Sequence, residues 1–176
     1  MTKQNFFINP LNAADANQLY QFIAENKERL HYYYFPKTFS ENETLEKTKA
    51  YIDLKSNEIL QKTNFTFAIR NKNNNEIAGL IIIKKIDWTR SQGEIAYCIG
   101  SQFEGKGITS FAVAEITKFA LQELNLKTLQ IIAHKTNLGS VKVALNNNFI
   151  WQKTLQNEFT PTNEAPLDME LYQLTN

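Results

Sequence analysis

A loop with two glycines lies near the middle of the chain, between an apolar run and an amphipathic one. It reads Gln102-Phe103-Glu104-Gly105-Lys106-Gly107-Ile108-Thr109, and it follows the strand-like segment 94–99. Glycines let the backbone turn with its N–H groups pointing inward, and the start of a helix adds partial positive charge. This spacing predicts an anion site that would accept a phosphate or a pyrophosphate.

Two well-known phosphate loops do not fit these residues. A Walker A loop needs Lys and then Ser or Thr after its last glycine, but Gly107 is followed by Ile108 and Thr109. A dinucleotide fingerprint needs a third glycine, which the segment lacks. Two readings therefore stay open, a different phosphate ligand or a helix start with two turn glycines.

Length and charge limit the classes of protein that this chain could represent. A chain of 176 residues fits one domain, and we expect a single domain over residues 1–176. Lys and Arg number 19 against 18 Asp and Glu, so charge gives no case for nucleic-acid or membrane binding. The longest apolar run, Ala78 to Ile83, is too short to span a bilayer.

Cysteine and histidine usage points to a cytoplasmic protein without a metal. Cys98 is the single cysteine, which excludes an intramolecular disulfide and favours a cytoplasmic location. The N-terminus also lacks the apolar run of a signal peptide. His31 and His134 lie far apart without helical spacing, so we expect no metal site.

Hydrophobic periodicity predicts alternating helices and strands. Strands are expected at 6–8, 65–70 (half-buried), 77–86, 94–99, 128–133, 149–154 and 168–174, and helices at 13–30, 40–60, 111–124 and 137–147. Asn12 or Asp15 would cap the first helix. A capping box from Ser40 to Glu43 would cap the second helix. The order predicts an α/β fold whose mixed sheet has about six to seven strands, flanked by helices. The three hairpin strands would be antiparallel, and strands 94–99 and 128–133 parallel or splayed.

Three segments carry a resemblance to a known family. The pattern Gln102-x-x-Gly105-x-Gly107 resembles the pyrophosphate loop of the GCN5-related N-acetyltransferases (GNAT). The run 94–109 resembles the central motif of the ribosomal-protein (RimJ/RimL-type) N-acetyltransferases within that superfamily. The segment 137–149, with its Asn-x-x-Ser start, resembles a later helix of the same family. The opening around Pro10 and Asp15, the aromatic loop ending at Pro36 and the last strand 168–172 fit as well, so the resemblance covers nearly the whole chain.

The resemblance implies a single-domain GNAT fold, with the sheet splayed at the strand that binds the cofactor. It implies an acetyl-CoA-dependent enzyme that acetylates a primary amine by direct attack in a ternary complex. The acceptor would be a protein N-terminus or a small-molecule amine, and the protein a monomer or homodimer. Acetyl-CoA would contact Tyr97, Cys98 and Ile99 on the strand, Gln102, Phe103, Glu104, Gly105, Lys106, Gly107, Ile108 and Thr109 in the loop, and Asn137 and Ser140 beyond it.

Acetyl transfer to an amine needs a route for the amine proton and a proton for the leaving thiolate. Glu94, expected to be an unpaired carboxylate, is the candidate base, directly or through water; the alternative is an ordinary strand-edge glutamate. Ser140 is the candidate acid near the thioester sulfur, or else only the N-cap of its helix. A buried small apolar residue is the better reading of Cys98 than a nucleophile.

The acceptor side of the site is less defined. We expect His31, Tyr32 and Tyr33, in an aromatic loop, either to line the acceptor cleft or to pack beneath the first helix. Glu158 could contact the acceptor from the loop before the last strand. Ala144 stands where relatives place a catalytic tyrosine, so an alternative is a non-catalytic acyl-CoA-binding module of the same fold.

Overall fold

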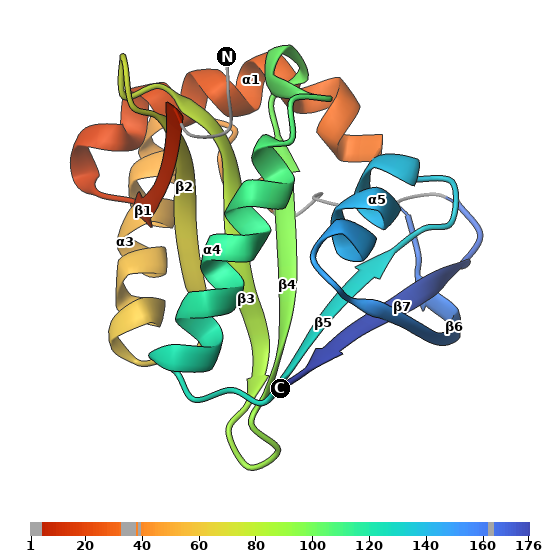
Figure 1. Ribbon diagram of the computed structural model, residues 1–176. Helices are drawn as coiled ribbons and strands as arrows, with labels where there is room; N and C mark the ends of the chain where they lie inside the picture. Colours follow the sequence, from red (N-terminus) through yellow and green to blue (C-terminus); the bar gives the residue numbers. More distant parts are fainter. Residues whose placement is uncertain (1–4, 33–37, 39, 162–163) are drawn as a thin grey trace. The chain divides into compact units, whose positions relative to one another are not determined.

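Seven strands of the described chain form one mixed sheet in the order β1-β2-β3-β4-β5-β7-β6, flanked by helices (Figure 1). The computed structural model describes residues 5–32, 38, 40–161 and 164–176. The strands are β1 (Phe6–Pro10), β2 (Phe65–Asn71), β3 (Ile77–Asp87), β4 (Gln92–Ile99), β5 (Thr128–Ala133), β6 (Ile150–Phe159) and β7 (Leu167–Thr175). The helices are η2 (Ala13–Asp15), α1 (Ala16–Tyr32), α3 (Leu45–Leu60), η3 (Ser101–Phe103), α4 (Ile108–Gln122) and α5 (Leu138–Asn146). The predicted α/β class and element order are confirmed.

The chain divides into two compact units. The first contains residues up to Ile82 together with Tyr97–Ile108, and the second contains Ile83–Ala96 together with Thr109–Asn176. The strands β3 and β4 contribute residues to both units. The predicted single domain over residues 1–176 remains a prediction.

In the first unit, β1 pairs antiparallel with β2, and α3 packs against α1 and β2. Side chains such as Leu19, Ile52 and Leu80 form its core and are at most 1% exposed. All seven residues of β2 are buried, so the prediction of a half-buried strand is wrong. The polar side chains that suggested alternation are buried too, because β2 lies inside the sheet and carries α3 on it.

The helix caps confirm one prediction and correct another. Asn12 caps the first helical segment by accepting the Ala14 N–H, while Asp15 accepts the Asn12 N–H at 2.8 Å. The second helix begins later than predicted, because Thr44 has an extended backbone and its hydroxyl accepts the Lys47 N–H. The predicted capping box from Ser40 to Glu43 is therefore wrong.

One close backbone approach explains a glycine inside β3. A Cβ atom at Gly79 would lie 2.2 Å from the carbonyl oxygen of Cys98. Any other residue would force β3 and β4 apart at this point. Gly79 therefore lets the two strands approach inside the first unit.

In the second unit, β4 and β5 are parallel from the pair Gln92–Thr128 to the pair Glu94–Gln130, whereas β4 itself continues to Ile99. Of the predicted parallel or splayed arrangement, the parallel pairing is confirmed. Strand β7 is antiparallel to both β5 and β6, and β6 forms the edge of the sheet. No helix in the described part of the chain is long and apolar enough to cross a membrane.

Candidate active site

The glycine loop is fixed by a buried side chain on either side of it. Phe103 and Ile108 are 4% and 1% exposed, and the four residues between them are exposed. The Phe103 ring packs edge-on against Phe6 with 5.9 Å between ring centroids. The exposed loop directly before α4 is thus anchored at both ends by the buried side chains of Phe103 and Ile108.

The backbone of the loop has the geometry that the glycines predicted. Gly105 and Gly107 have φ angles of +70° and +73°, in the left-handed region that favours glycine. The N–H groups of Phe103 and Glu104 donate to the carbonyls of Gly100 and Ser101, just before the loop, at 2.9 and 3.3 Å. The backbone N–H groups of residues 105–107 have no hydrogen-bond partner among the described residues. The candidate anion site is therefore centred on residues 105–107 and the start of α4.

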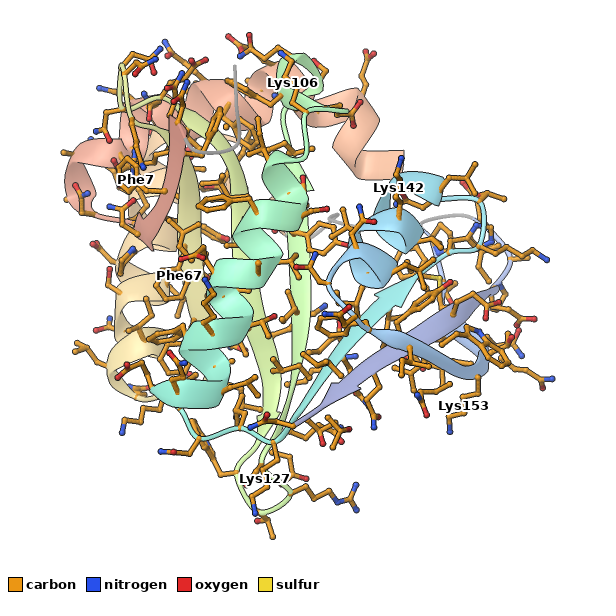
Figure 2. All side chains as sticks on the ribbon, in the orientation of Figure 1. Phe7, Phe67, Lys106, Lys127, Lys142 and Lys153 are labelled. Atoms are coloured by element: carbon orange, nitrogen blue, oxygen red, sulfur yellow. The ribbon has the colours of Figure 1, made fainter. Side chains whose placement is uncertain are left out.

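Side chains brace this loop from within the first unit. Asn26 is buried and accepts the Ser101 N–H at 3.1 Å, and Gln102 donates to Glu76 at 3.0 Å. The Lys106 ammonium donates to the Gln102 carbonyl and remains exposed at the loop (Figure 2). A cation beside unpartnered N–H groups adds to the attraction for an anion.

The residues of β4 that were predicted to contact acetyl-CoA differ in how far they are buried. Cys98 is 6% exposed and belongs to the apolar core of the first unit, which agrees with the prediction of a small buried residue. Tyr97 and Ile99, the neighbours of Cys98, are half-buried, and so is Thr109 at the start of α4. The half-buried positions keep part of their surface accessible.

Asn137, rather than Ser140, caps α5. The Asn137 side-chain oxygen accepts the Ser140 backbone N–H at 3.1 Å, and α5 begins at Leu138. The prediction that Ser140 could be the N-cap is wrong, because Asn137 precedes the first turn and Ser140 lies within it. The Asn137 amide nitrogen keeps its donor capacity.

Glu94 lies in the second unit, where its surroundings correct its predicted state. It is 7% exposed, and its carboxylate pairs with the Lys84 and Lys85 ammonium groups at 2.9 and 3.0 Å. The expectation of an unpaired carboxylate is therefore wrong. The ion pairs could have been predicted from the hairpin turn between β3 and β4. This turn places residue 94 opposite residues 84 and 85 on the neighbouring strand.

Lys85 also joins Glu94 to the other predicted acid. Its ammonium lies 3.8 Å from the Glu158 carboxylate. Burial alone would lower the pKa of Lys85, but its ion pairs and hydrogen bonds with Glu94 and Glu158 outweigh burial and raise that pKa. The ammonium form is thereby favoured.

A pocket of about 290 Å³ in the second unit brings these two acids together. Its lining mixes charged, amide and apolar side chains from β3, β4, β5, β6 and β7: Lys85, Gln92, Glu94, Gln130, Ile132, Lys153, Leu155, Glu158 and Leu171. Sequence reasoning missed Lys85 and Lys153, because lysines on strands resemble ordinary surface residues. Glu158 lies in β6 and not in the predicted loop.

The other residues that were predicted to contact the acceptor lie at the end of α1 and beyond it. His31 and Tyr32 form the end of α1, where the sequence predicted a loop. Their side chains, and Tyr33 entirely, lie outside the described residues. Ala144, which stands at the family's tyrosine position, is fully buried. Among the described residues, no group of three or more His, Cys, Asp or Glu side chains is placed to hold a metal ion.

Comparison with known proteins supplies an independent line of evidence. Residues 5–150 match the family model described as an acetyltransferase (GNAT) domain. The ribosomal-protein-serine acetyltransferase of Escherichia coli (strain K12) is 29% identical over 156 residues. That alignment covers 88% of this chain and 83% of the relative.

Solved structures show the same fold at lower identity. RimL, a ribosomal L7/L12 alpha-N-protein acetyltransferase in complex with coenzyme A, has a TM-score of 0.88 at 18% identity, covering 97% of this chain and 94% of its own. The microcin C7 self-immunity acetyltransferase MccE, in complex with acetyl-CoA and AMP, has a TM-score of 0.87 at 21% identity, covering 98% and 93%. At these identities the likeness establishes the fold.

Proposed function

Because this chain belongs to the family of acetyltransferase (GNAT) domains, we propose that it transfers the acetyl group of acetyl-CoA to a primary amine by direct attack in a ternary complex. It is an acetyl-CoA-dependent N-acetyltransferase. A protein N-terminal amine is the favoured acceptor, since two relatives are ribosomal-protein acetyltransferases by name, and a small-molecule amine is the alternative. The same relatives support a cytoplasmic location as part of the proposal.

The backbone of the glycine loop is the observation that carries the proposal. Gly105 and Gly107 hold left-handed angles on an exposed loop, and a Cβ at either position would meet no heavy atom within 4 Å. Packing therefore does not require glycine at these positions. Glycine does permit the N–H groups of residues 105–107 to converge on a diphosphate at the start of α4.

Asn137 and Ser140 are proposed as the residues that meet the rest of acetyl-CoA. The Asn137 amide nitrogen would donate to a carbonyl of the pantetheine arm, while its side-chain oxygen keeps α5 capped. The Ser140 hydroxyl would supply a proton to the thiolate that leaves. Neither role uses the Asn137 side-chain oxygen or the Ser140 backbone N–H, which together cap α5.

Replacing Ser140 by Ala separates this chemistry from helix stability. Because Asn137 provides the cap, Ser140→Ala should change the free energy of unfolding by less than about 0.5 kcal/mol. We expect kcat to fall by about tenfold or more, as for loss of a general acid. The matched control is Asn137→Ala, which should lower stability by about 1 kcal/mol in urea unfolding. An unchanged kcat in Ser140→Ala would remove the serine from the reaction.

Glu94 is proposed to take the amine proton through a water molecule. Glu94 is 7% exposed and its carboxylate lies against the Lys84 and Lys85 ammonium groups, so a water molecule would carry the amine proton to it. Glu158 is the other acid of the pocket, with a side chain 37% exposed. The amine must lose its proton before it can attack the thioester carbonyl.

Replacing Glu94 by Gln tests this role. We expect kcat at neutral pH to fall by about 100-fold, since general-base catalysis contributes at least that much. The affinity for acetyl-CoA should stay unchanged in calorimetric titration, because the variant leaves the glycine loop intact. Glu158→Gln is the matched control, with the same charge change in the same pocket. A normal rate for Glu94→Gln together with a reduced rate for Glu158→Gln would transfer the role to Glu158.

The ion pairs of Glu94 also favour a second candidate function. A carboxylate held by two ammonium groups and the absence of a tyrosine at position 144 suit a module that binds acyl-CoA without turnover. Such a module would bind acetyl-CoA tightly and release no thiol with any amine. Thiol release over a panel of amines separates the two functions.

A further inference from the structure

The pocket in the second unit receives its charged lining from two backbone irregularities, of which the first lies in β3. Consecutive side chains of a strand point to opposite faces. Lys84 and Lys85 nevertheless both reach the Glu94 carboxylate, at 2.9 and 3.0 Å. Lys85 has a φ angle of +50°, which breaks the alternation at this point.

The second irregularity lies in β6. Lys153 and Leu155 share one face of this strand, and Glu158, five residues after Lys153, should point to the other face. Asn157, with a φ angle of +53°, lies in a register shift between Leu155 and Phe159. After this shift Glu158 lines the same pocket as Lys153 and Leu155.

Left-handed backbone angles at residues other than glycine are uncommon and gather at functional sites, although asparagine adopts them more readily than lysine. Here Lys85 and Asn157 each bring a charged group to one pocket, and the two groups meet, since Lys85 lies 3.8 Å from Glu158. Asn157 is held in place by its N–H, which donates to Asp168 at 2.9 Å. The irregularities therefore build the pocket.

The pocket lining holds two lysines and two glutamates, Lys85 and Lys153 against Glu94 and Glu158, but these charges are not paired one to one. Glu94 pairs with two lysines, and Glu158 lies near one of them, but Lys153 is exposed and has no ion pair among the described residues. The carboxylate of Glu170 on β7 is engaged by Trp151 and Thr154, away from this pocket. Lys153, which Figure 2 shows extending from β6, is thus an ammonium group of the pocket that no carboxylate of the described residues pairs with.

The pocket also lies where the sheet opens. Glu94 and Gln130 form the last pair of the parallel ladder between β4 and β5, and both side chains line the pocket. A volume of about 290 Å³ is at the lower end of the range that holds small ligands. A small polar group can therefore enter beside β4, the strand along which the family resemblance places acetyl-CoA.

We propose that this pocket receives the acceptor and selects amines that carry a carboxylate near the amino group, such as peptides with an acidic second residue. Lys153 contacts the carboxylate, and Glu158 contacts the ammonium form of the acceptor before the amine loses its proton. Ile132, Leu155 and Leu171 contact the apolar part of the acceptor. This inference rests on the proposed acetyltransferase function and assigns its substrate class.

The test uses two sets of N-terminal peptides that differ only in Asp or Asn as the second residue. Acetylation rates give kcat/KM, and fluorescence anisotropy with CoA present gives the equilibrium affinity of the same peptides. The wild-type protein should prefer the acidic peptide by about threefold to fivefold at low salt, and by less at high salt. Lys153→Gln should abolish the preference, and Lys153→Glu should reverse it. Lys127→Gln, an equal charge change outside the pocket (Figure 2), should leave it unchanged.

The outcomes separate this inference from the proposed function. Acetylation without a preference for the acidic peptide, or with a preference that survives Lys153→Gln, would overturn the inference and leave the enzyme intact. Binding with a preference that depends on Lys153, but without acetylation, would support the pocket and contradict the transfer reaction. If the protein neither binds nor acetylates any of the peptides, the inference is overturned.

Discussion

Replacing Gly105 or Gly107 by Val is expected to abolish measurable acetyl-CoA binding in a protein that still folds. At φ angles of +70° and +73°, a side chain costs about 1–2 kcal/mol, and a β-branched residue will shift the backbone to relieve it. That shift turns the N–H groups of residues 105–107 away from the diphosphate. A Cβ at either position meets no heavy atom within 4 Å, so no clash opposes folding.

Calorimetric titration with acetyl-CoA measures the loss, and circular dichroism with thermal unfolding checks the fold. Asn125→Val is the matched control, because Asn125 has a left-handed φ angle of +54° in the turn before β5. It should introduce comparable backbone strain and leave the affinity for acetyl-CoA unchanged. A folded Gly107→Val variant with wild-type affinity would contradict the assignment of the loop.

Replacing Arg70 by Met is expected to cause the largest loss of stability, about 3–5 kcal/mol. The Arg70 side chain is 1% exposed, pairs with Asp15 at 2.6 Å and donates to Asn9 at 2.7 Å. Removing the guanidinium would leave the buried Asp15 carboxylate without its counter-charge. Asp15 also accepts the Asn12 N–H, so the start of the first helix would be weakened as well.

Urea unfolding measures this effect. Lys118→Met, which breaks the exposed pair between Lys118 and Glu115, is the control and should cost less than about 1 kcal/mol. The double variant Asp15→Asn with Arg70→Met should lose less than the sum of the two single changes, because the pair acts as a unit. An Arg70→Met protein as stable as the wild type would contradict the structural role of the pair.

Local signals in the sequence were sufficient for most elements of the fold. Residues 128–133 were predicted as a strand and form one with the same bounds, because a short apolar run is closed on both sides by polar turns. Asn148 has a left-handed φ angle of +62°, which asparagine tolerates better than most residues, and it turns the chain before Phe149. In both cases the residues that determine the local structure lie within a few positions of it in the sequence.

The failures of prediction depended on contacts between distant parts of the chain. Strand β6 extends to Phe159, beyond the predicted end, because a register shift at Asn157 interrupts the alternation that reveals a strand. One of the two ion pairs of Glu94 involves Lys85, whose left-handed backbone breaks the alternation of the neighbouring strand. Neither the shift nor the pairing has a periodic signature in the sequence.

The candidate site was predictable in unequal parts. The loop 102–109 was recognisable because glycine spacing determines backbone geometry locally. The acceptor side was not, because its pocket draws one to three residues from each of five strands and lacks a contiguous motif. Lys153 illustrates this difference, since its importance comes from the absence of an ion pair in the described structure, whereas its neighbours in the sequence give no indication of it.

Acetyl transfer itself tests the central claim most directly. The purified protein is incubated with acetyl-CoA and a panel of N-terminal peptides and small amines, and both CoA thiol release and acetylated product are measured. We predict thiol release that requires at least one acceptor, matches the product formed and disappears in Gly107→Val. Tight binding of acetyl-CoA by the folded protein, with no thiol release for any acceptor, would contradict the claim and support the non-catalytic module.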